Sequence, residues 1–309
     1  MRRSFFVDAI VLMIAVLLLL LLFFAEYSLT IGFSIAGNNY DFINEPGNVS
    51  IYFCPSAECQ NLFEQVPKYA KCALYDYGGF VPPKLSVIDK RNFNGFGIKS
   101  FNKNLMHNKY CVYDGVVITG SHNPTNNKNF DVVIVLKSIS ISEEFSEAFD
   151  LLSIGKKPVT DDKTVNLSGV LVSSFHCPGD DCRDSVLEEL RKSKHSIYFL
   201  AYSFTDDIIA EELIKSDVYI EGVFSKQKFL GEERKNLRFR NIYEFNGSGL
   251  LHHKLFIIDN SSIITGSANP SMNGYEHNDE NILIIRSDAV ARKFVDEYLR
   301  IRKLSVPVT

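Results

Sequence analysis

The sequence predicts an α/β fold made of two similar lobes, preceded by one apolar amino-terminal segment. Strand-like apolar runs alternate with amphipathic stretches over most of the chain, which is typical of layered α/β proteins. A long motif occurs twice, once in each half of the chain. The total of 309 residues is enough for one large domain or two smaller ones.

The composition indicates a folded chain without a strongly charged surface. Hydrophobic residues make up 46% and charged residues 23%, values that argue against disorder. The formal net charge is −4, whereas a protein that holds nucleic acid by bulk charge alone is far more basic. Any phosphate chemistry must therefore depend on a local arrangement of side chains.

The amino-terminal segment predicts a single-pass membrane anchor. Phe5 to Ala25 contains Asp8 as its only charged residue, and at about 1.5 Å per residue it is about 31 Å long, enough for a bilayer core. Arg2 and Arg3 precede this segment, and the next basic residue is Lys68. We therefore expect a cytoplasmic amino terminus and an extracytoplasmic catalytic part. A cleaved signal peptide remains the alternative.

These observations divide the chain into five parts. The polar stretch from Gly155 to Asn166 is interpreted as the connection between the two lobes. The predicted order is a membrane anchor (1–28), an extracytoplasmic linker (29–47), a first lobe (48–154), a second linker (155–166) and a second lobe (167–309).

Four of the six cysteines are arranged in two equally spaced pairs. Cys54 with Cys59 and Cys177 with Cys182 share the pattern C-P-x-x-x-C. In an oxidising compartment each pair would close a small disulfide loop. A zinc site with four thiolates and plain reduced thiols remain alternatives. Cys72 and Cys111 lie in apolar surroundings and are interpreted as buried small apolar residues.

The repeated motif provides the strongest evidence of duplication. Met106 to Pro124 and Leu251 to Pro270 both contain H-x-K-x-x-x-x-D followed by T-G-S-x-N-P. Asn129-Phe130-Asp131 and Asn278-Asp279-Glu280 then each open an apolar run. We expect the two sheets to lie side by side, with the motifs meeting at a pseudo-twofold axis.

The flanking patterns predict individual elements. The first half has no evident counterpart of the second helix of the other half. The predicted helices are Ser142 to Leu152, Asp184 to Lys192, a helix capped by Thr205 that ends near Lys215, and Asp288 to Lys303; the predicted strands include Ser196 to Ser203 and Val218 to Phe224.

Each motif brings one imidazole and one ammonium to a common surface. Alternate side chains of a strand share a face, so the side chains of His107 and Lys109 lie on the same side, as do those of His252 and Lys254. Together they would form a cationic cup suited to the oxygens of a phosphodiester. A neutral imidazole can attack phosphorus, and a protonated imidazole can donate its proton to the leaving oxygen. No metal is expected, because lysine supplies the positive charge.

Other residues of the repeat have supporting places. Asn123 and Asn269 reach the same cup as amide donors, after glycine-serine steps that permit close backbone approach. Asp131 and Glu280 are placed to fix the second nitrogen of each imidazole. Asp114 and Asp259 belong to the signature and are counted with the candidate catalytic residues, although their odd spacing predicts that they brace a turn.

The paired motifs resemble the phospholipase D superfamily over about Val49 to Lys303. The resemblance implies a duplicated α/β sandwich and a phosphohistidine intermediate formed without metal or other cofactor. It implies that His107 and His252 are the nucleophile and general acid pair; His107 is favoured as nucleophile, and the reverse assignment remains open. It also implies that Asp131 orients His107, through water because of its shorter side chain, and that Glu280 orients His252. The implied phosphate-binding residues are Lys109, Lys254, Asn123, Asn269, Ser121 and Ser267.

The resulting hypothesis is a membrane-anchored, metal-independent phosphodiesterase. The preferred activity is that of a nuclease acting on DNA or RNA. The basic stretch Lys226 to Arg240 carries interleaved phenylalanines on which bases could stack. Hydrolysis or transfer of phospholipid headgroups is the alternative, and a non-catalytic tethered nucleic-acid-binding module is the second. With both motifs in one chain, catalysis requires no oligomer.

Other histidines carry weaker predictions. A metal site built from His252, His253 and His277 is disfavoured, because adjacent strand residues face opposite sides. His122, His176 and His195 are interpreted as ordinary surface or loop residues.

Overall fold

The computed structural model describes residues 42–160, 163–226 and 241–308. The predicted membrane segment at residues 5–25 and nearly all of the basic stretch 226–240 lie outside these ranges. Among the described residues, no helix combines the length and apolar character needed to cross a bilayer.

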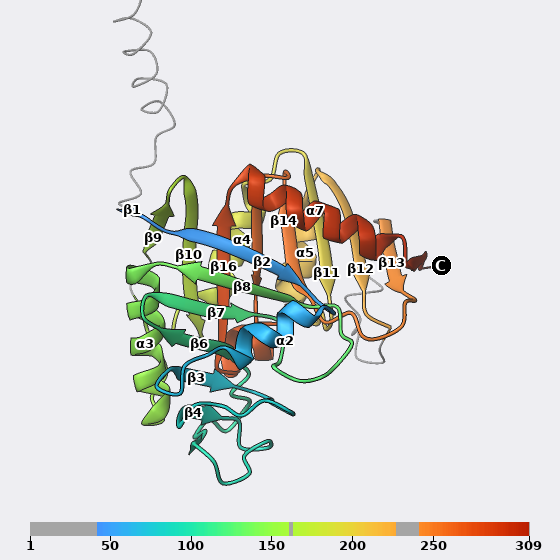
Figure 1. Cartoon of the computed structure of the whole chain (residues 1–309). Helices are drawn as coiled ribbons and strands as arrows, with labels where there is room; N and C mark the ends of the chain where they lie inside the picture. Colours follow the sequence, from blue (N-terminus) through green and yellow to red (C-terminus); the bar gives the residue numbers. More distant parts are fainter. Residues whose placement is uncertain (1–41, 161–162, 227–240, 309) are drawn as a thin grey trace, which may run out of the picture. The chain divides into compact units, whose positions relative to one another are not determined.

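The strands of the described residues form two sheets with the same internal order (Figure 1). The first sheet, in spatial order, contains β2 (Asn48–Phe53), β8 (Val132–Lys137), β7 (Val116–Gly120), β6 (Lys109–Tyr113), β3 (Lys71–Leu74), β4 (Leu85–Ile88) and β5 (Ile98–Lys99). The second contains β1 (Phe42–Glu45), β9 (Thr164–Leu167), β10 (Val170–Cys177), β16 (Glu280–Arg286), β15 (Ser262–Gly266), β14 (Lys254–Ile258), β11 (Ser196–Ala201), β12 (Tyr219–Phe224), β13 (Asn241–Phe245) and β17 (Ser305–Pro307).

The duplication is visible strand by strand. The order β2-β8-β7-β6-β3-β4-β5 matches β10-β16-β15-β14-β11-β12-β13. The directions match as well: β3 and β4 are parallel, as are β11 and β12, while the motif strands β6 and β14 are antiparallel to β3 and β11. The predicted α/β fold with two related lobes is therefore confirmed.

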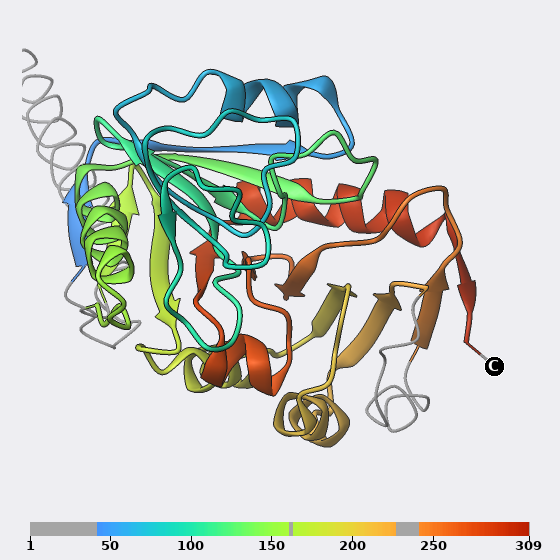
Figure 2. The ribbon, with the colours of Figure 1, turned by 90° about the horizontal axis from the view of Figure 1, so that it is seen from below.

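Two long helices fill the space between the sheets. They are α3 (Ile139–Ser153) and α7 (Asp288–Arg302). Phe145 of α3 and Phe294 of α7 are fully buried in a core to which both sheets contribute. Figure 2 shows α7 between the strands of the first sheet and those of the second. Replacing either phenylalanine with alanine would cost about 3–5 kcal/mol of stability.

Shorter helices cover the outer faces of the sheets. The helix α2 (Ala57–Glu64) packs on β2, whereas α4 (Cys182–Arg191) packs on β10 and on α5 (Asp207–Lys215). Each outer face has its own cluster of buried apolar side chains. The described part of the chain is thus layered as helix, sheet, helices, sheet, helices.

Local sequence explains where these helices begin. Serine hydroxyls cap both central helices: Ser138 accepts a hydrogen bond from the Ile141 amide, and Ser287 from the Val290 amide. The predicted cap at Thr205 was wrong by one residue. The cap is Asp206, whose carboxylate accepts a hydrogen bond from the Ile209 amide at 3.0 Å. A negative charge at this position also complements the helix dipole.

Both predicted linkers contain part of a strand. Phe42–Glu45 pairs in parallel with Thr164–Leu167, so the ends of the stretches 29–47 and 155–166 extend the second sheet. The sequence did not reveal this pairing, because alternate residues of β9, Thr164 and Asn166, are polar and only half-buried.

All six cysteines form disulfides. The structure joins Cys54 to Cys59 and Cys177 to Cys182, the two pairs suggested by spacing, which leaves no thiolates for a zinc site. It also joins Cys72 to Cys111, so the interpretation of these two as separate apolar residues was wrong. They are direct partners across β3 and β6, with Cα atoms 4.1 Å apart.

Candidate active site

The two halves exchange backbone hydrogen bonds at the amino ends of the motif strands. The His107 amide donates to the Asp279 carbonyl at 2.8 Å, and the Asp279 amide donates to Leu105 at 2.8 Å. Correspondingly, the His252 amide donates to the Phe130 carbonyl at 2.9 Å. Each histidine is therefore placed beside the residue that precedes the other half's carboxylate.

Each imidazole is oriented by a carboxylate of the opposite half. Nδ1 of His107 lies 2.7 Å and 2.9 Å from the two carboxylate oxygens of Glu280. Nδ1 of His252 lies 2.8 Å from Oδ1 of Asp131. The predicted pairing within each half was wrong, because the backbone exchange carries each carboxylate across the pseudo-twofold axis. The Asp131 contact is direct, without the predicted intervening water.

Two glycines bring the carboxylates into position. A Cβ at Gly120 would lie 2.2 Å from the Val132 carbonyl oxygen, and one at Gly266 would lie 2.2 Å from the Asn281 carbonyl oxygen. Both glycines have positive φ, at 137° and 146°. Only glycine permits this approach, and the neighbouring backbone carries Asp131 and Glu280.

The motif serines support the carboxylates rather than a phosphate. The Ser121 hydroxyl donates to Asp131 at 2.8 Å, and the Ser267 hydroxyl bonds to Glu280. Both serines are fully buried, so their predicted contact with phosphate was wrong. Burial alone would raise the pKa of each carboxyl group. His252, His122 and Lys254 outweigh this effect at Asp131, and His107, Lys109 and the Ser267 hydroxyl outweigh it at Glu280. The pKa of Asp131 lies well below its ordinary value, and that of Glu280 is also lowered.

The motif lysines lie directly behind the imidazoles. The Lys109 ammonium donates to the His107 carbonyl at 2.5 Å, and the Lys254 ammonium to the His252 carbonyl at 2.6 Å. Burial lowers the pKa of Lys109 to about 8. Burial, reinforced by the Lys109 charge, lowers the pKa of Lys254 to about 7.

Two tyrosines that the sequence analysis missed complete the arrangement. The Tyr75 ring lies 4.7 Å from the His107 ring, and the Tyr202 ring lies 4.7 Å from the His252 ring. Each ring also lies 5.3 Å from the lysine ammonium of its motif, a cation–π geometry. Both tyrosines follow the last residue of the strand that pairs with the motif strand, and this repeated position was the available signal.

Both imidazoles line one cavity of about 460 Å³. Most residues of its wall have polar side chains, and both halves contribute to it. Asn269 belongs to this wall, whereas Asn123 does not, although the amide oxygens of both lack a partner among the described residues. The wall consists of Tyr75, Arg91, Asn104, Leu105, His107, Tyr202, Ser203, His252, Asn269, Ser271, Asn273 and Asn278.

The signature aspartates do not reach the cavity. Asp114 lies five residues beyond Lys109, about 16 Å along an extended strand. Its side chain accepts a hydrogen bond from Tyr69. Asp259 accepts the amides of residues 194–196, each at 2.8 Å. Both adopt positive φ in the turn, so they brace the turns and their inclusion among the catalytic residues was wrong.

Two further histidines are buried rather than exposed. His122 lies 3.6 Å from Asp131, and His176 packs against Phe145 with ring centroids 4.7 Å apart. His176 lies in β10, so its interpretation as a surface or loop residue was wrong. His122 lies in a loop, as predicted, but is buried, whereas His195 is exposed. Neither buried ring is part of the cavity wall.

Burial favours neutral imidazoles. Burial lowers the pKa of His252 to about 4, with further lowering by Lys254 and Lys109, against the opposing effect of Asp131. Burial and the same two ammoniums also lower the pKa of His107, although the Glu280 carboxylate acts in the opposite direction. Because each Nδ1 faces a carboxylate acceptor, Nδ1 carries the hydrogen and the lone pair lies on Nε2.

Comparison with known proteins identifies the family. A family model described as "Cardiolipin synthase, PLD-like domain" matches residues 186–302. A protein named phospholipase D from Rickettsia felis is 30% identical over 158 residues, which cover 46% of this chain and 76% of that protein. The phospholipase D of Rickettsia prowazekii is 31% identical over 146 residues, covering 43% and 67%.

The chain belongs to the phospholipase D superfamily. It spans about two thirds of the length of several of the curated relatives that it matches. Among solved structures, phosphatidylserine synthase of Haemophilus influenzae superposes with a TM-score of 0.62 at 12% identity, covering 84% of this chain and 87% of that one. This likeness supports the superfamily's duplicated fold alone.

The crossed carboxylates predict a specific pattern of proton resonances. In this superfamily member, the Nδ1–H of His107 donates to Glu280 and that of His252 to Asp131. The downfield NMR resonance that is lost in His107→Ala should therefore also be lost in Glu280→Gln, and it should persist in Asp131→Asn. Loss of the same resonance in Asp131→Asn, with persistence in Glu280→Gln, would instead support pairing within each half, between His107 and Asp131.

The buried lysines predict an alkaline loss of activity. Because burial lowers the histidine pKa values, neutral imidazole is present from mildly acidic pH upward. The ammonium charge disappears as pH rises through about 7 for Lys254 and about 8 for Lys109. We expect kcat/KM for a phosphodiester to fall over this range. In Lys254→Arg the guanidinium stays charged, so any remaining activity should decline only at higher pH. A wild-type profile that stays flat to about pH 9 would contradict this prediction.

Proposed function

We propose that this chain is a metal-independent phosphodiesterase that uses its two histidines in sequence. The observation that carries the proposal is the presence of both imidazoles, each fixed by a buried carboxylate, in the wall of one cavity. Membership of a superfamily of hydrolytic phosphodiesterases supports the same conclusion.

In the first step Nε2 of His107 attacks phosphorus. The new N–P bond forms as the bond from phosphorus to the leaving oxygen breaks, and His252 gives a proton to that oxygen. In the second step His252, now neutral, takes a proton from water as that water attacks phosphorus, and His107 is released. The choice of His107 as nucleophile rests on the superfamily resemblance.

The electrostatics explain how His252 obtains its proton. Its pKa of about 4 leaves it neutral at pH 7. A bound phosphodiester adds a negative charge beside the ring, which favours the protonated form. Asp131 on the other ring nitrogen stabilises the imidazolium. The buried ammoniums of Lys109 and Lys254 stabilise the negative charge that develops around phosphorus.

Nucleic acid is the substrate that the cavity favours. Its wall combines amides, hydroxyls, Arg91 and two tyrosine rings, and Leu105 is its one aliphatic residue. Amides and arginine suit sugar and phosphate oxygens, and exposed aromatic faces suit bases.

Phospholipid is the second candidate substrate. The Rickettsia relatives are named phospholipase D, and the matched family model is described as a cardiolipin synthase domain. The apolar segment at residues 5–25 would hold the cavity near lipid headgroups. Such an enzyme would transfer or release headgroups, with the acyl chains left in the bilayer.

We also propose an extracytoplasmic location with a membrane anchor. The uncharged run from residue 9 to residue 25 and the preceding arginines support the anchor and its orientation. Three disulfides support an oxidising compartment, because cytosolic thiols are kept reduced.

The mechanism predicts complete dependence on both histidines and none on metal. His107→Ala and His252→Ala should each lower turnover to background, whereas His195→Ala, at an exposed ring outside the cavity, should retain it. EDTA should leave the wild-type rate intact, since Lys109 and Lys254 provide the positive charge. The measurement compares labelled single-stranded DNA, duplex DNA, RNA and phospholipid vesicles side by side. Strong inhibition by EDTA, or turnover in either alanine variant, would overturn the mechanism.

The location predicts the behaviour of the chain in cell fractions. The full chain should stay in the membrane pellet after an alkaline wash. Its cysteines should react with a thiol reagent only after reduction, because all six are paired. Recovery in the soluble fraction would refute the anchor, and thiols that react without reduction would refute the oxidising compartment.

A further inference from the structure

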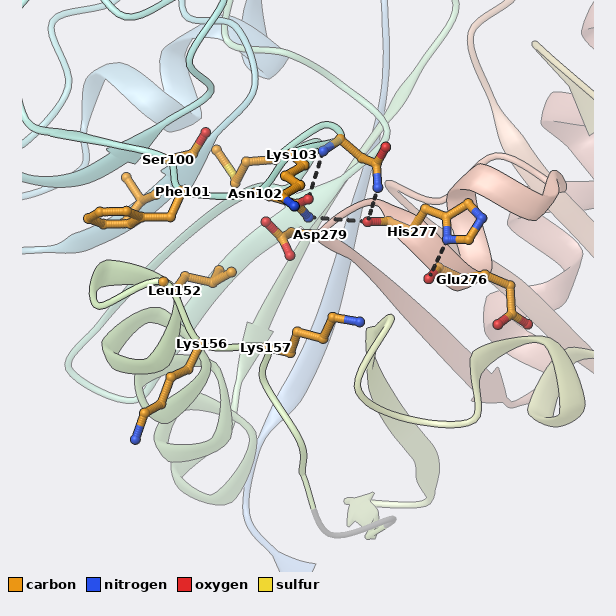
Figure 3. A pocket seen from close by; sticks show the side chains of 14 residues that line it. Ser100, Phe101, Asn102, Lys103, Leu152, Lys156, Lys157, Glu276, His277 and Asp279 are labelled. Carbon is orange, nitrogen blue, oxygen red and sulfur yellow. Dashed lines mark hydrogen bonds between the residues drawn. The ribbon is translucent and has the colours of Figure 1, made fainter.

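A second cavity, of about 290 Å³, adjoins the catalytic one (Figure 3). Asn104 belongs to the walls of both cavities. Its side-chain amide donates to the His277 carbonyl at 3.4 Å, and Asn102 donates to the same carbonyl at 3.2 Å. The partition between the cavities is therefore a short loop of the first half bonded to the second half.

The charge of this second cavity is predominantly positive. Lys103 and Lys157 belong to its wall, together with two carboxylates, whereas the side chain of Lys156, also at this wall, is directed away from the cavity. Glu276 is paired with Arg183 at 2.8 Å. Burial, with the nearby charges of Glu280 and Asp89, raises the pKa of Asp279 to about 7 against the opposing effects of Asn102 and of the Lys157 ammonium, so this group is only partly charged at neutral pH.

An exposed aromatic ring stands at the edge of the same cavity. Phe101 is 64% exposed, although it is a large apolar side chain. A Cβ at Gly155 would lie 3.0 Å from the Phe101 ring, so the ring is supported by backbone on one side. Proteins that bind single-stranded nucleic acid combine an exposed aromatic face, on which a base stacks, with nearby basic side chains that pair with phosphates. The Phe101 ring and the adjacent lysines have this arrangement.

We propose that the second cavity is a binding subsite for the part of a single-stranded nucleic acid that adjoins the scissile phosphate. A base stacks on Phe101, and a neighbouring phosphate is held by Lys157 with Lys103, while the strand passes Asn104 to the catalytic cavity. Figure 3 shows the Lys157 side chain directed across the cavity and that of Lys156 directed away from it. The inference rests on the proposed nuclease function and extends it to the path of the strand.

Binding of a short labelled single-stranded DNA to the full chain in detergent tests the subsite. A His107→Ala background keeps the DNA intact during the measurement. Phe101→Ala should weaken binding about ten-fold without changing its salt dependence. Lys157→Gln should weaken binding and reduce the slope of log K against log salt by about 0.7, the value for one phosphate contact on a single strand.

Two matched controls separate the subsite from general effects. Lys156→Gln removes the same charge one residue away, and Phe96→Ala removes a phenylalanine that is 37% exposed outside the cavity. Both should bind DNA like the parent chain. Equal losses in Lys156→Gln and Lys157→Gln would indicate unspecific attraction and would overturn the proposal, as would unchanged binding in Phe101→Ala and Lys157→Gln.

Turnover distinguishes failure of the subsite from failure of the proposed function. With His107 restored, Phe101→Ala and Lys157→Gln should raise KM for the DNA and leave hydrolysis of bis(4-nitrophenyl) phosphate, which has one phosphate, unchanged. Equal losses on both substrates would overturn the subsite and leave the function standing. Absence of turnover on both substrates in the wild type would overturn the function, while the binding experiment still decides the subsite. Variants that lose activity only on cardiolipin vesicles would assign the cavity to lipid and overturn the proposal.

Discussion

The exchange of backbone hydrogen bonds between the two repeats is the constraint on which the rest of the site depends. The segments before His107 and before His252 each run beside the segment that leads into the other repeat's carboxylate. This placement decides which carboxylate meets which imidazole. It also brings both rings to one cavity, since each strand end is held against the other half.

Buried charge is the cost of this arrangement. Two carboxylates and two ammoniums lie beneath the imidazoles, and an isolated ion at such depth is strongly unfavourable. Their opposite signs, with hydroxyl and backbone partners, offset the loss of hydration. The balance nevertheless leaves both lysines easier to deprotonate than in water. The positive charge at the site therefore depends on pH in the neutral range, where most lysines are unaffected.

Sequence patterns predicted the elements that depend on local periodicity. The duplicated motifs, the helices near Ser142 and Asp288, and the shared face of each histidine and lysine follow from spacing alone. The pairing of Asp131 with His252 does not, because the aspartate is closer in sequence to the other histidine and only the tertiary exchange separates them. The role of Tyr75 was hidden for a related reason. Its position matters only once the neighbouring strand is known, and strand order is a long-range property.

One register position is held together differently in the two repeats, where β3 meets β6 and where β11 meets β14. The first repeat joins this position covalently through Cys72 and Cys111, while the second fills the equivalent place with Phe199 opposite Phe256. A reductant would therefore loosen only the strand pair that leads to His107, and the pair that leads to His252 would keep its apolar packing. The two imidazoles have similar immediate contacts, but the strand pairs that carry them differ in chemistry. The pair that leads to His107 is sensitive to the redox state of its surroundings, whereas the pair that leads to His252 is not.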